Sequence, residues 1–130
     1  MKAQFKIDTE TWLISSQTKY PMYFEGQTEN DLGAHLYIKF IPISTTRPAI
    51  NCEQTRFILR FHIYSDNMLT NDKIFDELSS LVSERNLNGI EFGTLTYHQR
   101  GNRFGDSWEH IADCSAFHWH DPSAIVESLT

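Results

Sequence analysis

The chain has 130 residues, of which 40% are hydrophobic and 22% are charged, and its net charge is −6. This length and balance are typical of one folded domain, no apolar stretch is long enough to cross a bilayer, and the first residues lack the apolar run of a secretory signal. The excess of acidic residues argues against general binding to the phosphate backbone of nucleic acids, which needs a basic surface.

The N-terminal segment, residues 1–19, follows neither a helical nor a strand period. Asp8 or Thr9 is suited to cap a short helix that ends at Ser15. Residues 20–24 then read as a short extended segment, with a proline that suits a strand start or a sheet edge.

Two strands are predicted in the middle of the chain, over 35–43 and 55–64, with a long connection over 44–54 between them. The second strand has the clearest alternation, which predicts one buried face and one face that is wet or contacts a partner. The buried side of this strand is Phe57, Leu59, Phe61 and Ile63, and the other side is Arg56, Ile58, Arg60 and His62.

The main helix is predicted at about 71–86, with Thr70 or Asn71 as its N-cap and Asn88-Gly89 just beyond its end. Its apolar residues recur with helical spacing and form one stripe that faces the core. The stripe consists of Ile74, Phe75, Leu78, Leu81 and Val82.

The C-terminal third is predicted to hold a strand over 90–98, a polar connection over 99–107 and a long strand over 108–119. The short connection implies an antiparallel hairpin. Residues 121–130 read as a tail or a short helical turn.

These elements predict a single α+β domain over residues 1–130, in which a four- to five-stranded antiparallel or mixed sheet has one main helix packed on one face. Nine Phe, five Tyr and three Trp suit a sheet-rich core, because aromatic rings pack well on pleated surfaces. Whether the N-terminal segment is a helix or a strand stays open.

His118 and His120 form the most suggestive local motif, because residues i and i+2 of a strand point to the same face. Together with Cys114 they offer the ligand types of a zinc site. An extended strand places Cys114 roughly 13 Å from His118, which is too far for shared coordination. Packing histidines are therefore the simpler interpretation, and no metal or cofactor is predicted.

No catalytic residue is identified. Cys52 and Cys114 lack the surroundings of a cysteine nucleophile and are interpreted as free thiols, with a single disulfide as the alternative. The glycines match neither a phosphate loop nor a dinucleotide fingerprint. The sequence favours a binding or assembly protein, and the alternative from a different class is a small metal-dependent enzyme that uses His118 and His120.

Charge is unevenly distributed along the chain. Residues 39–60 contain four basic residues and one acidic residue, whereas residues 105–130 contain five acidic residues and no Lys or Arg. This separation is either ordinary solvated surface or the mark of copies that associate with one another, the basic part of one facing the acidic part of the next.

The order of elements and the apolar pattern over about residues 20–120 resemble the tail terminator, or tail completion, proteins of long-tailed bacteriophages. That family typically opens with an amphipathic helix, and residues 1–19 read poorly as one. The segments that carry the resemblance are Tyr20–Gly26, Leu36–Phe40, Phe57–Tyr64, Asn71–Arg85, Gly89–Leu95 and the closing strand with Trp108 and Phe117.

The resemblance implies a structural role without a catalytic residue. Such proteins form a ring, typically hexameric, on the head-proximal end of the tail tube, where the ring stops tube growth and offers a docking surface for the head. The implied partners are further copies of the chain, the tail tube protein and the head-completion or connector protein, with DNA only as passing cargo and no membrane. The implied location is the virion tail, and the host cytoplasm during assembly. Another head–tail joining protein or a tube-like subunit is the alternative within this class.

Five arginines are candidates for contacts with the tube, the connector or a neighbouring copy. Three of them lie in the two predicted polar connections, and segments that project from a rigid sheet often carry function. The other two share the polar side of the strand over 55–64. The candidates are Arg47, Arg56, Arg60, Arg100 and Arg103.

Overall fold

A computed structural model describes residues 4–16, 19–27, 33–49, 52–87 and 89–120. The predicted tail, residues 121–130, lies outside the described residues. Two helices and seven strands follow along the chain: α1 (Gln4–Ser15), β1 (Met22–Phe24), β2 (His35–Ala49), β3 (Cys52–Ser65), α2 (Met68–Val82), β4 (Asn86–Leu87), β5 (Ile90–Phe92), β6 (Thr96–Phe104) and β7 (Ser107–His120).

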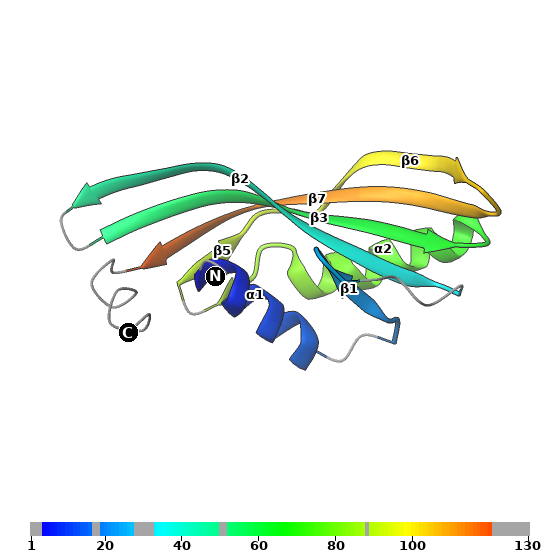
Figure 1. The fold of residues 1–130 in the computed structure, drawn as a ribbon, viewed down its shortest axis with the longest axis horizontal. Coiled ribbons are helices and arrows are strands. Elements are labelled where there is room, and N and C mark those ends of the chain that lie inside the picture. The colour runs from blue at the N-terminus through cyan, green and yellow to red at the C-terminus, as the bar shows by residue number, and fades with distance from the viewer. Residues whose placement is uncertain (1–3, 17–18, 28–32, 50–51, 88, 121–130) are drawn as a thin grey trace.

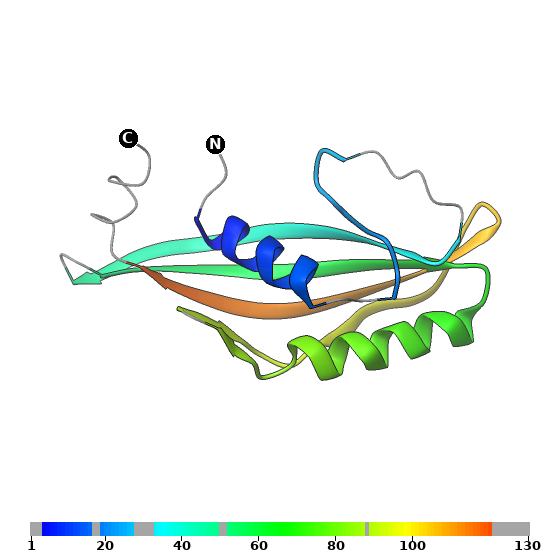
Figure 2. The same ribbon diagram turned by 90° about the horizontal axis from the view of Figure 1, so that it is seen from below.

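The strands form one mixed sheet in the order β1-β2-β3-β7-β5-β4, and β6 also pairs with β7. The β1–β2 pair is parallel and the other pairs are antiparallel. Both helices lie on the same face of this sheet (Figure 1; Figure 2). The predicted α+β class with a main helix on one face is confirmed, although the sheet has seven strands instead of four or five.

The connection predicted over 44–54 is wrong, because β2 continues to Ala49 and β3 begins at Cys52. The two strands stay paired up to Ala49 and Cys52. Pro42 suggested an early end, but it lies beside a bulge on an edge strand, since β1 covers only Leu36–Ile38 of β2. An edge strand tolerates a residue that has no backbone N–H to donate.

The strand predicted over 90–98 is divided into β5 and β6, which both pair with the same edge of β7. Gly93 directly follows β5, and its N–H donates to the Ser115 carbonyl at 2.8 Å. A Cβ at this position would lie 2.8 Å from Ser115 Oγ, so a larger residue would require the Ser115 side chain to move.

The connection predicted over 99–107 is also wrong, because the observed turn is much shorter. β6 runs to Phe104, β7 begins at Ser107, and the turn between them is Gly105-Asp106. The predicted antiparallel hairpin is confirmed. Bulges in β6 absorb the residues that resembled a loop, because each bulge adds a residue without ending the strand.

The N-terminal segment contains a helix, α1, that ends at Ser15 as predicted but begins before both proposed caps. Its inner side packs on the sheet through Thr9 and Leu13, both 0% exposed, and through Trp12, which stacks on Phe92 with 5.4 Å between ring centroids. Its apolar residues are divided between two sides, which explains why the sequence shows no helical period there.

The main helix, α2, ends at Val82, four residues earlier than predicted, and its N-cap is Asn67. The Asn67 side chain accepts a hydrogen bond from the Leu69 N–H at 2.8 Å, as an N-cap does. The Asn71 side chain points inward instead and donates to the Trp108 carbonyl. Gly89 lies in the β4–β5 turn and not at the helix end, with φ of +80°.

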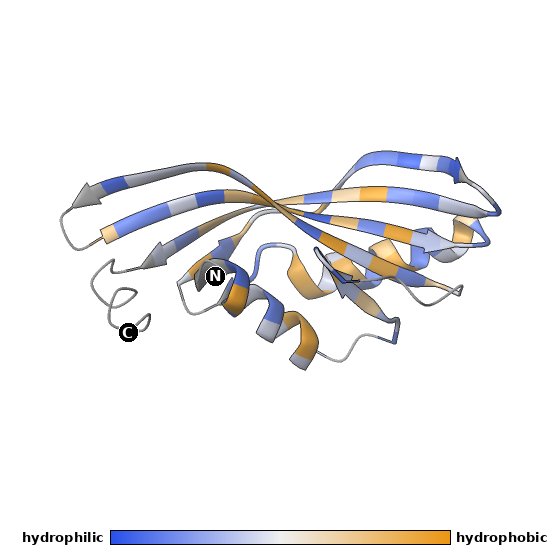
Figure 3. Cartoon of the chain, viewed as in Figure 1, coloured by the Kyte–Doolittle hydropathy of each residue, from blue (hydrophilic) through white to orange (hydrophobic). Residues whose placement is uncertain are grey.

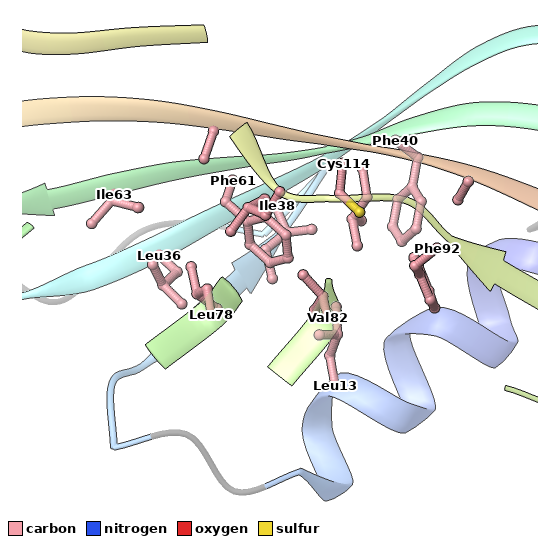
Figure 4. Close-up of a cluster of buried hydrophobic side chains, with 14 of the residues drawn as sticks. Leu13, Leu36, Ile38, Phe40, Phe61, Ile63, Leu78, Val82, Phe92 and Cys114 are labelled. Carbon is pink, nitrogen blue, oxygen red and sulfur yellow. The ribbon is translucent and has the colours of Figure 1, made fainter. Parts of the chain in front are cut away.

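The core lies between the helices and the covered face of the sheet (Figure 4). The predicted buried side of β3 is confirmed, since its four apolar residues are all 0% exposed. The predicted stripe of α2 is also confirmed: Ile74, Leu78 and Val82 are buried, and Phe75 and Leu81 pack against them. Of the helices that the structure describes, neither is long and apolar enough to span a membrane.

Candidate functional site

The side of the sheet opposite α1 and α2, here called the open face, has no helix over it among the described residues (Figure 1). Hydrophilic and hydrophobic residues alternate along β3 and β7, as the bands in Figure 3 show. Cross-strand pairing places side chains of β2, β3 and β7 in rows on this face. The rows are Tyr37–His62–Ile111, Lys39–Arg60–Asp113, Ile41–Ile58–Ser115 and Ser44–Arg56–Phe117.

The central row contains a two-point ion pair between Arg60 and Asp113. Arg60 Nε lies 2.7 Å from Asp113 Oδ1, and Nη2 lies 2.9 Å from Oδ2. These hydrogen bonds raise the pKa of Arg60. Paired, planar hydrogen bonds fix the geometry of both side chains, so Arg60 is engaged within its own chain. Its predicted role as a contact residue is less favoured by this geometry.

The end of the open face nearer the α2 N-terminus is built from stacked rings of two neighbouring rows. His62 and His35 both stack with Tyr64, and His62 Nδ1 lies 3.2 Å from Glu109 Oε2. His35 is 8% exposed and the His62 side chain 12%. This end of the open face is therefore closed by its own side chains.

Arg56 and Lys39 are both exposed and have no ion pair among the described residues. The Arg56 guanidinium lies over the Phe117 ring, 5.1 Å from its centroid, and the Lys39 ammonium lies 5.7 Å from the centroid of Tyr37. Both cations are therefore held above aromatic rings. These two exposed cations flank Ile41 and Ile58, which are half-buried and apolar. This part of the open face is therefore both basic and apolar.

Arg47, predicted in a loop, lies on β2 near the end of the β2–β3 hairpin. Its Nη2 atom lies 3.1 Å from Glu53 Oε2 on the neighbouring strand. The Arg47 side chain is 58% exposed, and exposed pairs of this kind contribute little to stability.

Arg100, also predicted in a loop, lies on β6 and contacts the N-terminal part of α2. Its Nη2 and Nε atoms lie 2.6 and 3.0 Å from the two carboxylate oxygens of Asp72. Tyr97 OH also donates to Asp72 Oδ1 at 2.6 Å, and the Tyr97 ring stacks on Phe75. These contacts attach β6 to α2, so Arg100 supports the fold on the covered side of the sheet.

Asp72 is the most strongly perturbed carboxylate in the described part of the chain. Its hydrogen bonds from Arg100, and then from Tyr97, lower its pKa to about 2. Burial, together with the hydrogen bond to Asp72, raises the pKa of Tyr97. Both effects hold Asp72 as an anion and Tyr97 as a neutral donor.

His110 lies beneath this cluster and is 0% exposed. Its Nδ1 atom accepts the Gly101 N–H at 3.1 Å, which requires the tautomer with the proton on Nε2. Nε2 lies 3.3 Å from Asp72 Oδ1 but without hydrogen-bond geometry. The cluster contains an acid and an imidazole but no nucleophile, and every contact in it joins one element to another.

Arg103, the fifth candidate, lies on β6 opposite Trp108 of β7. Its guanidinium is 5.1 Å from the centroid of the Trp108 ring, and its Nε donates to the Gly105 carbonyl. The structure therefore separates Arg100 and Arg103, because one is bound to α2 and the other covers the hairpin turn.

The histidine motif does not assemble a metal site among the described residues. His118 is 2% exposed, and its Nε2 atom lies 3.3 Å from Asp8 Oδ2 of α1. No group of three His, Cys, Asp or Glu side chains that could hold a metal ion is found in the described part of the chain. The side chain of His120 lies outside the description.

The two cysteines are free thiols, as predicted. Cys114 is buried, and burial raises the pKa of its thiol to about 11. A thiol held in its protonated form is a poor nucleophile. Cys52 lies at the start of β3 and is half-buried.

A small apolar cavity of about 170 Å³ lies between the chain that follows α1, β2 and the side of α2 that carries Ile74 and Leu78. Tyr20, Leu36, Leu78 and Leu81 contribute to its walls, and the Lys19–Glu77 ion pair, at 3.2 Å, lies among its lining residues. It contains no catalytic arrangement and is smaller than the pockets that usually bind small ligands.

Sequence reasoning missed the apolar residues that α1 exposes. Ile7 is 41% exposed and Ile14 is 64% exposed. Their spacing places them on one side of the helix, roughly opposite the buried Thr9. The absence of a helical period in residues 1–19 was the one sign of this arrangement. Apolar residues on two sides of a helix leave it without a single apolar stripe, so no helical period is seen.

Comparison with known proteins identifies the fold and no family. No protein-family model matches the chain, and no curated protein is significantly similar to it in sequence. A solved protein chain, whose name describes no activity or partner, superposes with a TM-score of 0.59 at 15% sequence identity. The match covers 93% of this chain and 96% of that chain, so the two share the fold over nearly their full lengths.

Proposed function

We propose that this protein is a structural subunit of a bacteriophage tail, a terminator that forms a ring on the head-proximal end of the tail tube. The ring stops growth of the tube and presents the docking surface for the head. Its partners are further copies of the chain, the tail tube protein and the head connector, while DNA passes through as cargo. No step in this role requires a catalytic residue, a metal or a cofactor.

The observation that carries the proposal is the open face of the sheet. In a solitary antiparallel domain the uncovered face is usually polar, whereas here Ile41, Ile58 and Phe117 lie half-buried between exposed cations. Apolar surface rimmed by charge is typical of protein–protein contact. A subunit that meets other subunits on its sheet suits an assembly role.

A second supporting feature is that the charged groups of the polar clusters are paired with one another within the chain. The most perturbed group, Asp72, is occupied by Arg100 and Tyr97, and Asp113 by Arg60. Perturbed groups can mark active sites, but structural ion pairs perturb pKa values in the same way. Here each group joins one secondary-structure element to another.

Another head–tail joining protein, or a subunit that resembles the tube protein, is the alternative within this class, because both would also use an open sheet for contact. The metal-dependent enzyme is less favoured. His118 of β7 is buried and contacts Asp8 of α1, which leaves its Nε2 atom beside a carboxylate and away from solvent.

Electron microscopy of the purified protein, alone and with purified tails, tests the proposal. We expect rings of one size, or tube ends that carry a cap at one end only. Tube-binding without a cap, along the length of the tube, would favour a tube-like subunit. Protein that joins neither tails nor itself would contradict the proposal, and turnover that depends on added zinc and is lost in His118→Ala would support the enzyme.

A further inference from the structure

Helix α1 has two apolar sides, and the fold covers only one of them. Thr9 and Leu13 are 0% exposed against the sheet, while Ile7 and Ile14 are 41% and 64% exposed. Thr11 lies between these two isoleucines on the same side and is also exposed. A surface helix of a solitary domain normally presents polar residues to water, so the outer side of α1 has the composition of a second interface.

The apolar part of the open face is the other uncovered surface. It comprises Ile41, Ile58 and Phe117, with Trp119 39% exposed toward the end of β7. It lies on the opposite side of the sheet from α1 (Figure 1; Figure 2). The chain therefore has two unlike apolar surfaces that point in opposite directions.

We propose that the outer side of α1 in one copy docks on the open face of a second copy. Two different surfaces that bind each other make a head-to-tail contact, which generates a closed ring when the rotation between copies closes. This inference deepens the proposed function and rests on it for the closure of the ring. The contact itself requires only two copies of the chain.

Charge supports a second copy as the occupant. The open face presents the exposed cations Lys39 and Arg56 beside its apolar centre. The outer side of α1 carries an acidic residue, because Glu10 lies three residues after Ile7 and four residues before Ile14. Opposite signs on the two surfaces steer the copies together and set their orientation.

The apolar side of α1 is tested with a pair of matched variants. Ile14→Lys places a cation opposite Lys39 and Arg56 of the neighbouring copy, and lysine is at least as good a helix former as isoleucine. Leu69→Lys is the control, since Leu69 is 68% exposed on α2. Sedimentation velocity over a range of concentrations should show association of the wild-type protein, an association weakened at least roughly tenfold in Ile14→Lys, and no change in Leu69→Lys.

The identity of the two surfaces is tested by cross-linking. A photoreactive phenylalanine at position 14 should cross-link to residues of β2 and β3 on the open face of another copy, mapped by mass spectrometry. Arg56→Glu should reduce this cross-link. Cross-links confined to α1 of the partner would overturn the proposal in favour of a two-fold contact between helices, and a wild-type protein that stays monomeric, alone and with tails, would also overturn it.

These results separate the interface from the function. Cross-linked copies that leave tail ends uncapped would support the contact and contradict the terminator role. Capped tails in which position 14 cross-links nowhere on the open face would support the terminator role and contradict the contact.

Discussion

The two faces of the central sheet use the same alternation of residues for different purposes. On the covered face, Phe57, Leu59 and Phe61 of β3 are 0% exposed beneath the helices. On the open face, the intervening residues Ile58 and Arg60 are only partly buried. The comparison shows that a period of two separates the faces but does not say what covers either of them.

The two faces also differ in how their charged groups are paired. On the covered side, Asp72 joins α2 to β6 through Arg100 and Tyr97. On the open face, Arg60 and Asp113 neutralise each other while Arg56 lies free of ion pairs within the described residues. The covered cluster supports the fold, and the open face retains exposed cations.

Removing an aromatic ring from the covered face should have the largest effect on stability. Phe61→Ala leaves a cavity under the helices and should lower the free energy of unfolding by about 3–5 kcal/mol. Ile58→Ala, three residues away on the same strand but on the open face, should cost less because this side chain is already partly exposed to water. Urea unfolding measures both, and equal losses would contradict the difference between the faces.

Breaking the central ion pair of the open face should have an intermediate effect. Asp113→Asn leaves Arg60 without its carboxylate partner and should lower the free energy of unfolding by about 1.5–3 kcal/mol. Glu91→Gln, an exposed change on the adjacent strand β5, is the control and should be nearly neutral. An Asp113→Asn variant with an unchanged free energy of unfolding would show that the ion pair contributes nothing to stability.

The cluster on the covered side should make stability depend on acid. The pKa of Asp72 is lowered from 3.8 to about 2, so the unfolded chain binds the proton more readily than the folded chain. The stability that Asp72 contributes is fully present above pH 4 and is lost as the pH falls through about 2. Wild-type protein should therefore lose stability over this window more steeply than Asp72→Asn in urea unfolding at each pH. Parallel pH profiles for the two proteins would contradict this assignment.

A single hydroxyl should have the smallest measurable effect. Tyr97→Phe keeps the ring stacked on Phe75 but removes the hydrogen bond to Asp72, and should cost about 1 kcal/mol. Tyr23→Phe is the matched control, because its ring contact with His35 does not use the hydroxyl. Thermal unfolding would rank the two variants, and a loss in Tyr23→Phe as large as that in Tyr97→Phe would remove the special role of the Asp72 contact.

Local patterns predicted the elements whose residues repeat with one clear period. The alternation in β3 and the stripe of α2 follow from the order of the residues alone, because each sets one side of one element against the core. α1 was not recognised as a full helix because its apolar residues serve two surfaces. The ends of β2, β3 and β6 were misplaced because Pro42 and Gly101 resemble loop signals, whereas pairing with a long neighbouring strand continues through bulges.

The candidate site depended still more on tertiary structure. The sequence pointed to five arginines but not to their partners. Arg60 meets Asp113, which is 53 residues away along the chain, and Arg100 meets Asp72, which is 28 residues away. Such pairs depend on the strand order and on where α2 crosses the sheet, which no local spacing encodes.

The sequence by itself determined the α+β class, the buried side of the central strand and the core side of the main helix, because hydrophobic periodicity acts within each element. Only the tertiary structure decided that both helices lie on one face, that the other face stays open, and which cations remain exposed on it. The reason is that packing and ion pairing join residues that are distant along the chain, and their geometry exists only after the strands have found their order.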